Sequence, residues 1–345
     1  MSRTFSKRNL FFGKLKLFAE KELKILYKTG MMKNRREKDP RQSRKAFSSL
    51  RFPASNLQRR ISPMCFVIGI DVGGSTTKIV GISDEGVQKP LFVRAADPVA
   101  SLFGALGKYT YDNNIPLNSI EKIVLTGVGS AYIRQPLYGI PTAKADEFLA
   151  DGLGATYNTE LKETIVVSMG TGTSLVRVSG EEITHIGGIG IGGGTIVGLS
   201  NLLLKTSDIW EVIELAKCGN LENIDLQIQD ITTAPLEGLP LHATASNFGK
   251  VRGAVSQEDI ALGILNMVLQ CIGKSAILSA LNTPIRDFVL IGNLTQLPQC
   301  KEVFPVLEKM FGVRFLIPKY AEYRTAVGAA LAFILGHPVS EIREE

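Results

Sequence analysis

Residues 66–80 read FVIGIDVGGSTTKIV. This apolar run stops at Asp71, turns through Gly73 and Gly74, and resumes at Ile79, which predicts two buried strands joined by a glycine turn. Because glycine has no Cβ, the backbone of such a turn can approach a bulky anion and adopt conformations closed to other residues. The stretch therefore predicts either a phosphate-binding hairpin or an ordinary tight β-hairpin, which has the same pattern.

The polar side chains of this stretch suit the phosphates of a nucleotide. Hydroxyl and ammonium groups donate hydrogen bonds to phosphate oxygens, and a carboxylate can hold Mg²⁺ through water. Asp71 is accordingly the candidate magnesium ligand. The candidate phosphate contacts, besides Asp71 itself, are Gly73, Gly74, Ser75, Thr76, Thr77 and Lys78.

Length and charge bound the number of domains and the class of partner. A chain of 345 residues with 45% hydrophobic content can bury a full core and favours two domains. The net charge of +6 is uneven, because residues 1–63 hold 18 Lys and Arg against 4 Asp and Glu, whereas the rest holds 21 against 29. The acidic body is no obvious nucleic-acid binder, and we expect no transmembrane span and no membrane partner.

Residues 1–63 combine a basic, partly amphipathic stretch with a polar run rich in Lys, Arg and Ser. A secretory signal is disfavoured because Lys14 and Lys16 interrupt the apolar patch, and Glu20 and Glu22 weaken the case for a transit peptide. A surface-binding basic helix or a nucleic-acid arm stays open. The composition favours a segment that is disordered or not translated, since Met64 stands directly before the opening strand.

The four cysteines lie far apart and include no C-x-x-C pair: Cys65, Cys218, Cys271 and Cys300. This spacing argues against a zinc knuckle, a redox dithiol and a disulfide framework. A reducing cytoplasm is the compartment that fits it best.

From Met64 onward the hydrophobic pattern is that of an α/β protein. We expect a first domain over 64–160 and a second over 161–345, with the C-terminal helix packing back toward the site between them. Strands are expected over 122–127, within 163–178 and at the start of 287–294. The expected helices cover residues 98–113, 146–157, 196–204, 257–280 and 325–335.

Three further glycine segments resemble the opening hairpin in chemistry. Residues 163–178 repeat its strand, glycine turn and strand, while residues 186–195 hold six glycines before a predicted helix. Glycines at a helix start expose backbone N–H groups to an anion, although a flexible loop without a ligand has the same composition. Two hairpins could thus hold ATP from opposite domains, with adenine or ribose at the last glycine turn. The added candidates are Gly170, Thr171, Gly172, Thr173, Gly192, Gly193, Gly194, Gly292 and Asn293.

Phosphoryl transfer also needs a group that accepts the proton of the acceptor hydroxyl, and a carboxylate suits this role. The carboxylates near glycine turns are Asp71, Asp146 and Glu147, of which Glu147 is the candidate base. The alternative is that Glu147, or equally Asp146, is an exposed acid stabilised by the dipole at a helix N-terminus.

Five segments, in this order, resemble those of the type II pantothenate kinases. They are residues 70–74 (IDVGG), 169–174 (MGTGTS), 187–194 (GGIGIGGG), 245–249 (ASNFG) and 291–293 (IGN). The resemblance covers residues 64–335, and the glycine-rich segment followed by ASNFG is its most specific part. It implies two ribonuclease H-like domains of the actin, hexokinase and Hsp70 superfamily, with a nucleotide cleft between them.

The resemblance further implies that ATP, with Mg²⁺, phosphorylates the primary hydroxyl of pantothenate in a cytoplasmic homodimer, the first committed step of coenzyme A synthesis. Glu147 occupies the place of the catalytic glutamate, although a short spacing to Gly152 could move that role to Asp146. Thr171, His185 and Gly190 are the implied substrate contacts. Some family members carry arginine at the position of His185; arginine holds a carboxylate bidentately, whereas histidine holds it singly and only when protonated. A pantetheine-like acceptor therefore stays open.

Two rival functions share this superfamily. An ATPase that activates an acyl-CoA dehydratase has a similar opening motif but holds an iron–sulfur cluster through closely placed cysteines, and Cys218 lacks such a partner in the sequence. A sugar-responsive transcriptional regulator would carry an N-terminal helix-turn-helix, and residues 1–63 lack two amphipathic helices joined by a short turn.

Overall fold

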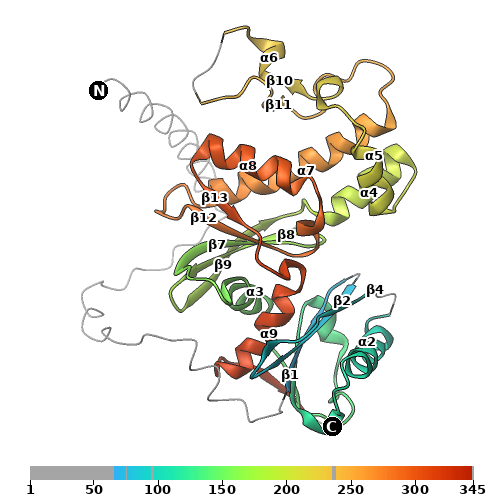
Figure 1. The fold of residues 1–345 in the computed structure, drawn as a ribbon, viewed down its shortest axis with the longest axis vertical. Helices are drawn as coiled ribbons and strands as arrows, with labels where there is room; N and C mark the ends of the chain where they lie inside the picture. The colour runs from blue at the N-terminus through green and yellow to red at the C-terminus, as the bar shows by residue number, and fades with distance from the viewer. Residues whose placement is uncertain (1–65, 75, 95–96, 235–237, 344–345) are drawn as a thin grey trace, which may run out of the picture. The chain divides into compact units, whose positions relative to one another are not determined.

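The computed structural model describes residues 66–345 except 75, 95–96, 235–237 and 344–345. These residues alternate strands and helices around two mixed sheets and a small two-stranded sheet, which confirms the predicted α/β class (Figure 1). They all fall in one compact unit of the chain. The predictions for residues 1–63, Cys65 and Ser75 lie outside the described residues.

The first sheet is built on the opening hairpin. Its strand order is β14-β6-β5-β1-β2-β3, with β4 also paired to β2. Strands β1, β5 and β6 run parallel, and β2 runs antiparallel to β1. A strand covered on both faces is expected to be apolar throughout, as β1 is except at Asp71. The strands are β1 (Phe66–Val72), β2 (Thr76–Ser83), β3 (Gly86–Val87), β4 (Leu91–Arg94), β5 (Ile120–Thr126), β6 (Thr142–Lys144) and β14 (Ser340–Ile342).

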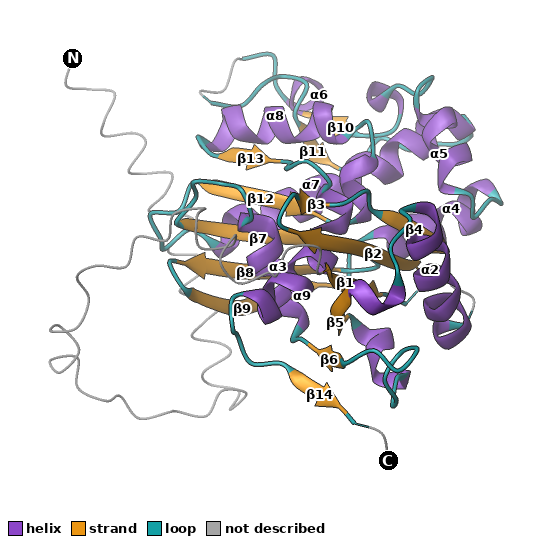
Figure 2. Cartoon of the chain, turned by 60° about the horizontal axis from the view of Figure 1, so that its bottom comes forward, coloured by secondary structure: helices purple, strands orange, loops and turns teal. Residues whose placement is uncertain are grey.

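The second sheet repeats this plan with the order β13-β12-β7-β8-β9, and Figure 2 shows these strands side by side. Strands β7, β8 and β9 form an antiparallel meander, while β12 and β13 run parallel to β7. Both sheets therefore combine a glycine hairpin with parallel strands that end at the same edge. The strands are β7 (Glu163–Met169), β8 (Thr173–Ser179), β9 (Glu182–Ile189), β12 (Asp287–Ile291) and β13 (Arg314–Leu316).

Helices cover both faces of each sheet. One face of the first sheet packs on α2 and the other on α9, while one face of the second sheet packs on α4, α5, α7 and α8 and the other on α3. The helices are α2 (Pro98–Asp112), α3 (Glu147–Thr156), α4 (Gly193–Leu204), α5 (Ile209–Ala216), α6 (Ile228–Ile231), α7 (Gln257–Ser279), α8 (Cys300–Phe311) and α9 (Arg324–Ile334). The remaining elements are β10 (Leu226–Gln227), β11 (Thr244–Ser246) and the 3₁₀ turns η2 (Leu117–Ser119), η3 (Val128–Tyr132), η4 (Leu221–Asn223), η5 (Asn293–Gln296) and η6 (Ala321–Tyr323).

The predicted helices are confirmed to within a few residues, but one predicted loop is wrong in part. The glycine-rich segment 186–195 was expected to be a loop, whereas β9 extends to Ile189 and α4 already begins at Gly193. Gly188 allows this because a Cβ there would lie 2.7 Å from the carbonyl oxygen of Thr173 on β8. Its missing side chain therefore serves close strand pairing.

Helix α7 is, among the described residues, the helix that is long and apolar enough to cross a membrane by length and composition. Most of its apolar stretch is buried inside the protein, where it packs on α4, α5 and α8. These contacts identify α7 as a core helix of the second sheet's helical layer.

Helix α9 packs on the first sheet and helix α3 on the second, and these two helices pack closely against each other (Figure 1). A Cβ on Gly154 of α3 would collide with the carbonyl group of Arg324, and one on Gly328 of α9 would collide with the carbonyl group of Ala150. Gly69 of β1 approaches the backbone of α9 in the same way. The two helices thus touch backbone to backbone, and α9 is buried along nearly its whole length. The domain boundary near residue 160 stays a prediction.

Replacing Gly328 tests this contact. We expect Gly328→Ala to lower the free energy of unfolding by at least about 2 kcal/mol, because the added methyl group must displace the backbone of α3. Gly104 is the matched control, since it is an exposed glycine of α2 with nothing near the place of a Cβ. Gly104→Ala should be neutral or stabilise by up to about 1 kcal/mol. Urea denaturation of both variants measures the difference, and equal effects would contradict the close packing.

Candidate functional site

Parallel pairing in the first sheet brings three polar residues to one edge. Asp71 near the end of β1 is in register with Thr126 at the end of β5, and Leu125 is in register with Lys144 at the end of β6. Glu147 begins α3 three residues after Lys144. The carboxyl ends of parallel strands are where α/β proteins place their ligand groups, so Asp71, Thr126 and Glu147 form one polar edge.

Asp71 and Lys78 form a buried ion pair across the opening hairpin. Lys78 Nζ donates to Asp71 Oδ2 at 3.3 Å, and the two residues are 5% and 8% exposed. Side chains alternate between the faces of a strand, so Thr77 points to the opposite face, where it is fully buried. The predicted phosphate contacts of this hairpin therefore lie on two faces of the sheet. Lys78 is on the same face as Asp71, whereas the hydroxyl of Thr77 is on the opposite face.

The carboxyl of Glu147 is half-buried at the start of α3. Burial raises its pKa, the carboxylates of Asp71 and then Asp146 raise it further, and Lys78 opposes them. Asp146 has a different task, because its side chain accepts a hydrogen bond from the backbone N–H of Leu149 at 2.9 Å and caps the helix. A carboxylate with a raised pKa is a stronger base near neutral pH, which favours Glu147 over Asp146 as the proton acceptor.

Two residues beside Asp71 were not predicted as site residues. Gly127 has φ 82° and a Cβ there would lie 2.6 Å from Asp71 Oδ1, so only glycine leaves room for that carboxylate. Thr126 Oγ1 is buried without a hydrogen-bond partner among the described residues. Both residues are placed by strand register, which the sequence does not display. The oxygens of Asp71, Thr126 and Glu147 are of the kind that Mg²⁺ prefers.

The other predicted phosphate loops come together at the edge of the second sheet. The backbone N–H of Gly193 donates to Gly170 O at 2.8 Å, and that of Gly194 donates to Thr171 O at 2.9 Å. Thr173 Oγ1 donates to Ile191 O at 2.8 Å. The hairpin turn 170–172 and the start of α4 are thereby bonded to each other, with Gly192 as the N-cap of α4.

The last glycine turn joins the same group of loops. Gly292 has φ 93°, and a Cβ there would lie 2.5 Å from the carbonyl oxygen of Met169. Ile291 is in register with Ser168 on the neighbouring parallel strand, so Asn293 follows directly beside the turn at Gly170. The partial positive charge at the N-terminus of α4 lies within this group of loops, which favours a nearby anion.

Asp151 is a buried acid that the sequence prediction missed. It lies one helical turn after Glu147 in α3, is 0% exposed, and accepts hydrogen bonds from Thr325 Oγ1 at 2.7 Å and Ser174 Oγ at 3.4 Å. Burial raises the pKa of Asp151 to about 7, and the charges of Glu147 and Asp71 act in the same direction. Asp151 therefore links α3 to α9 and β8 directly behind Glu147.

His185 of β9 lies next to the start of α3. Its ring stacks on the ring of Phe148, with centroids 3.8 Å apart and planes at 9°. Phe148 directly follows Glu147, so the stacking holds an exposed imidazole close to the candidate base. Thr171 and Gly190, the other predicted substrate contacts, are exposed as well.

The segment 245–249 (ASNFG) makes its contacts away from these loops. The carboxylate of Asp225, which is 0% exposed, accepts hydrogen bonds from Thr244 Oγ1, Asn247 Nδ2 and the N–H of Phe248. Asn266 Nδ2 of α7 donates to Asp225 Oδ2 at 2.8 Å. In the described residues this motif is thus anchored to α7 through one buried acid.

The buried acid Asp151 makes stability depend on pH. Its pKa is 3.8 when unfolded and about 7 when folded, so the folded state loses stability as pH rises through this interval and stays at the lower level above it. We expect Asp151→Asn to raise the free energy of unfolding at pH 8, by roughly 4 kcal/mol at most, and to change it little at pH 4. Denaturation at both pH values tests this, with Asp112→Asn on the exposed end of α2 as control. A pH-independent effect would contradict the assignment.

Solved structures resemble the chain in fold. The activator of the 2-hydroxyisocaproyl-CoA dehydratase from Clostridium difficile, solved with bound ADPNP, has a TM-score of 0.58 at 14% identity, covering 79% of this chain and 95% of the activator. A ROK family glucokinase from Streptomyces griseus, in complex with glucose and AMPPNP, has a TM-score of 0.51 at 12% identity, covering 77% and 98%. At this identity the likeness shows the fold alone. It confirms the predicted actin-like ATPase architecture.

Sequence relatives identify the family. The family model described as Fumble matches residues 154–308. The type II pantothenate kinase of Staphylococcus haemolyticus is 30% identical over 280 residues, which cover 78% of this chain and 99% of the relative. That of Bacillus cereus is 28% identical over 268 residues, covering 74% and 90%. The family model spans the second hairpin and the ASNFG segment, and the chain belongs to the type II pantothenate kinase family.

Proposed function

We propose that this protein transfers the γ-phosphoryl group of ATP to the primary hydroxyl of pantothenate. The observation that carries the proposal is the half-buried Glu147, held at a raised pKa beside the Asp71–Lys78 pair at the edge where the first glycine turn lies. Relatives named type II pantothenate kinase match the chain over most of its length. Sequence family and local chemistry therefore agree.

The nucleotide is held by backbone groups at two places. We place its phosphates between the turn at Gly73 and Gly74 and the bonded loops at Gly170 and Gly193, where glycine has no Cβ that would keep a phosphate away from the backbone. The dipole of α4 adds partial positive charge at its N-terminus. Adenine or ribose then lies at Gly292 and Asn293, beside the second hairpin.

Mg²⁺ accompanies the phosphates in this proposal. Asp71 would hold the ion, directly or through water, and Thr126 Oγ1 is a buried oxygen next to it without another partner among the described residues. When bound, the ion neutralises charge on the phosphates. Lys78, already paired with Asp71, adds a positive charge on the same face.

The chemical step needs one proton transfer and one displacement. The primary hydroxyl oxygen of the acceptor attacks the γ-phosphorus, the bond to the bridging oxygen breaks, and ADP leaves with that oxygen. Glu147 takes the hydroxyl proton and releases it later to solvent. Its raised pKa keeps it a useful base near neutral pH, and the Asp146 cap fixes the helix end that carries it.

The acceptor lies on the side of His185 in this proposal. The stacked pair of His185 and Phe148 presents a polar ring next to Glu147, with exposed Thr171 on the neighbouring hairpin and Gly190 after β9. A protonated imidazole makes a single contact with a carboxylate, where a guanidinium makes two. We therefore expect weaker binding of the pantothenate carboxylate than in enzymes with arginine here, and pantetheine, which lacks that carboxylate, is the second acceptor to test.

The alternative function, activation of an acyl-CoA dehydratase, has less support. The dehydratase activator resembles this chain in fold, at 14% identity. Among the described cysteines, Cys218 is exposed and Cys300 is buried with its thiol donating to Leu294 O at 3.2 Å, so they do not form a common cluster site. A stoichiometric iron–sulfur cluster in purified protein would revive this function.

We expect the enzyme to act in the cytoplasm as a homodimer. Helices α4 and α5 expose large apolar side chains that suit a subunit contact, namely Val197, Leu202, Leu203 and Trp210. Glycine loops of the site lead directly into α4. A subunit contact on these helices would therefore steady the nucleotide loops.

Replacing Glu147 tests the proposed base. In a coupled assay of ADP release with pantothenate, we expect Glu147→Gln to lower kcat at least about a hundredfold, the scale of general-base catalysis. Asp146→Asn is the matched control, because asparagine also caps a helix and the variant should keep most activity. In the wild type, kcat/KM should fall as pH falls through the raised pKa of Glu147, at higher pH than for an exposed glutamate. Unchanged turnover in Glu147→Gln would refute the role.

Replacing His185 tests the acceptor side. We expect His185→Arg to lower KM for pantothenate by about tenfold, because a bidentate ion pair replaces a single contact, and to leave KM for pantetheine unchanged. His185→Gln keeps a polar side chain of similar length and serves as control. If both acceptors respond equally to His185→Arg, the residue does not face the carboxylate.

A further inference from the structure

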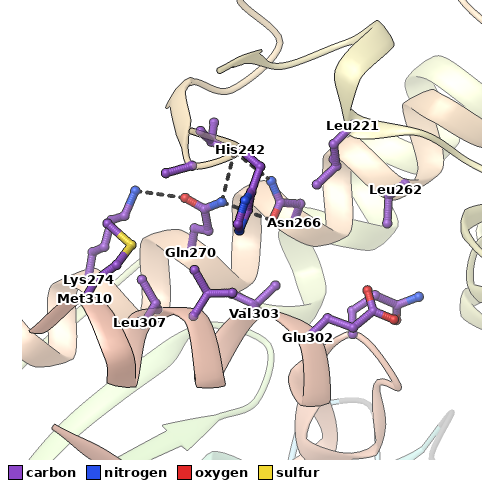
Figure 3. Close-up of a pocket in the computed structure, with 14 residues that line it drawn as sticks. Leu221, His242, Leu262, Asn266, Gln270, Lys274, Glu302, Val303, Leu307 and Met310 are labelled. Carbon is purple, nitrogen blue, oxygen red and sulfur yellow. Dashed lines mark hydrogen bonds between the residues drawn. The ribbon is translucent and has the colours of Figure 1, made fainter. Parts of the chain in front are cut away.

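A cavity of about 200 Å³ lies outside the site described above, between α7, α8 and the segment before β11 (Figure 3). None of its lining residues belongs to the glycine loops or to the edge with Asp71 and Glu147. Its volume is below that of a pocket for a drug-sized ligand, so it suits a molecule of about ten heavy atoms. Its two walls differ in chemistry.

The polar wall is a chain of hydrogen bonds along α7. Lys274 Nζ donates to Gln270 Oε1 at 2.8 Å, and Gln270 Nε2 donates to Thr244 Oγ1 and Asn266 Oδ1, each at 3.1 Å. Within the described residues no carboxylate lies within 4.0 Å of Lys274. An ammonium group has three donors, so this half-buried lysine has one neutral acceptor for a full positive charge.

The surroundings of Lys274 favour an anion. Burial lowers the pKa of Lys274, because removing the ammonium group from water disfavours its charged form. The side chain of Gln270, which accepts the hydrogen bond from Lys274, is held in place by its own hydrogen bonds to Thr244 and Asn266. Asn266 is held in turn by its hydrogen bond to the buried Asp225. The charge of Asp225 acts on Lys274 in the opposite direction, but only from beyond 4.0 Å, so the ammonium group is held at one end of the cavity by a neutral amide with no carboxylate in contact.

The opposite wall is apolar and comes from α8. Val303, Leu307 and Met310 line it, and Figure 3 shows Val303 and Leu307 between the ends marked by Lys274 and Glu302. The far end holds two acceptors, the carboxylate of Glu302 and the Oε1 of the buried Gln299, which has no hydrogen-bond partner among the described residues. A buried acceptor without a donor is unfavourable, so this end calls for a donor.

We propose that this cavity binds a small amphipathic carboxylate. Its carboxylate pairs with Lys274 and accepts from the polar wall, its aliphatic chain lies along Val303 and Leu307, and a hydroxyl or amide N–H at its far end donates to Gln299 Oε1. The order of charges in the cavity sets this direction, because Glu302 would repel the carboxylate from the far end.

The probe for the test is 6-hydroxyhexanoate, which carries a carboxylate, an aliphatic chain and a terminal hydroxyl. We expect titration calorimetry with the full-length protein to give a dissociation constant of about 1 mM, as for a good ligand of this size. Hexane-1,6-diol, which lacks the carboxylate, should bind at least about tenfold more weakly, because it leaves Lys274 unpaired. MgATP should not displace the probe, since the cavity shares no residue with the nucleotide loops.

Three variants locate the binding. Lys274→Met removes the charge at similar length, and Val303→Trp fills the cavity from α8; each should weaken binding of the probe at least about tenfold. Lys301→Met, at an exposed position of α8, is the matched control and should bind as the wild type does. Thermal melting checks that the variants fold, and the comparison of the two probes on the wild type does not depend on any variant.

Three outcomes would overturn the proposal. One is the absence of binding to the wild type at about 20 mM probe, well above the constant expected for its size. Another is equal binding of 6-hydroxyhexanoate and the diol. The last is a binding site in another place, shown either by MgATP abolishing the binding or by the folded Lys274→Met and Val303→Trp variants binding the probe as the wild type does. Each result would mean that the polar wall only anchors the ASNFG segment to α7. The readout is binding, so it stands apart from success or failure of pantothenate phosphorylation.

Discussion

The close contact between α3 and α9 is the constraint on which the rest of the described structure depends. Gly154 and Gly328 let the two backbones touch, and Gly69 lets α9 lie equally close to β1. Through this contact a helix from the end of the chain fixes the opening strand, while α3 lies against the second sheet. Arg324 strengthens the contact, because its guanidinium donates to the carbonyl oxygens of Gly154 and Tyr157. The position of Glu147 therefore follows from backbone packing several residues away.

Negative charge is concentrated around helix α3. The charge of Asp71 acts on both Glu147 and Asp151, and Lys78, which is paired with Asp71, opposes this effect at Glu147. Such like charges at low dielectric favour the protonated form of Glu147 and of Asp151. In the proposed mechanism this suits Glu147 as the base, and a magnesium ion brought with ATP would supply the further positive charge. Folding and catalysis thus make opposite demands on these acids, since burying them costs stability.

Local patterns predicted much of the fold and part of the site. Alternating apolar runs and glycine turns predicted both hairpins, and helical periodicity predicted α2, α3, α7 and α9, because these signals lie within one element. Strand register brings Thr126 and Gly127 to Asp71, and no local pattern carries that information. Asp151 resembles any surface acid of a helix in sequence, yet α9 buries it. Gly188 was mistaken for a loop residue because glycine permits both a loop and close strand pairing.

The most direct test of the account is ³¹P NMR of the protein with MgATP and pantothenate. We expect the γ-phosphorus signal of ATP to be replaced by that of a phosphate monoester, with mass spectrometry placing the new group on the primary hydroxyl of pantothenate. Conversion of ATP to ADP and inorganic phosphate alone, with pantothenate unchanged, would contradict it. That result would mean that the carboxylates around Glu147 activate water instead of an acceptor hydroxyl.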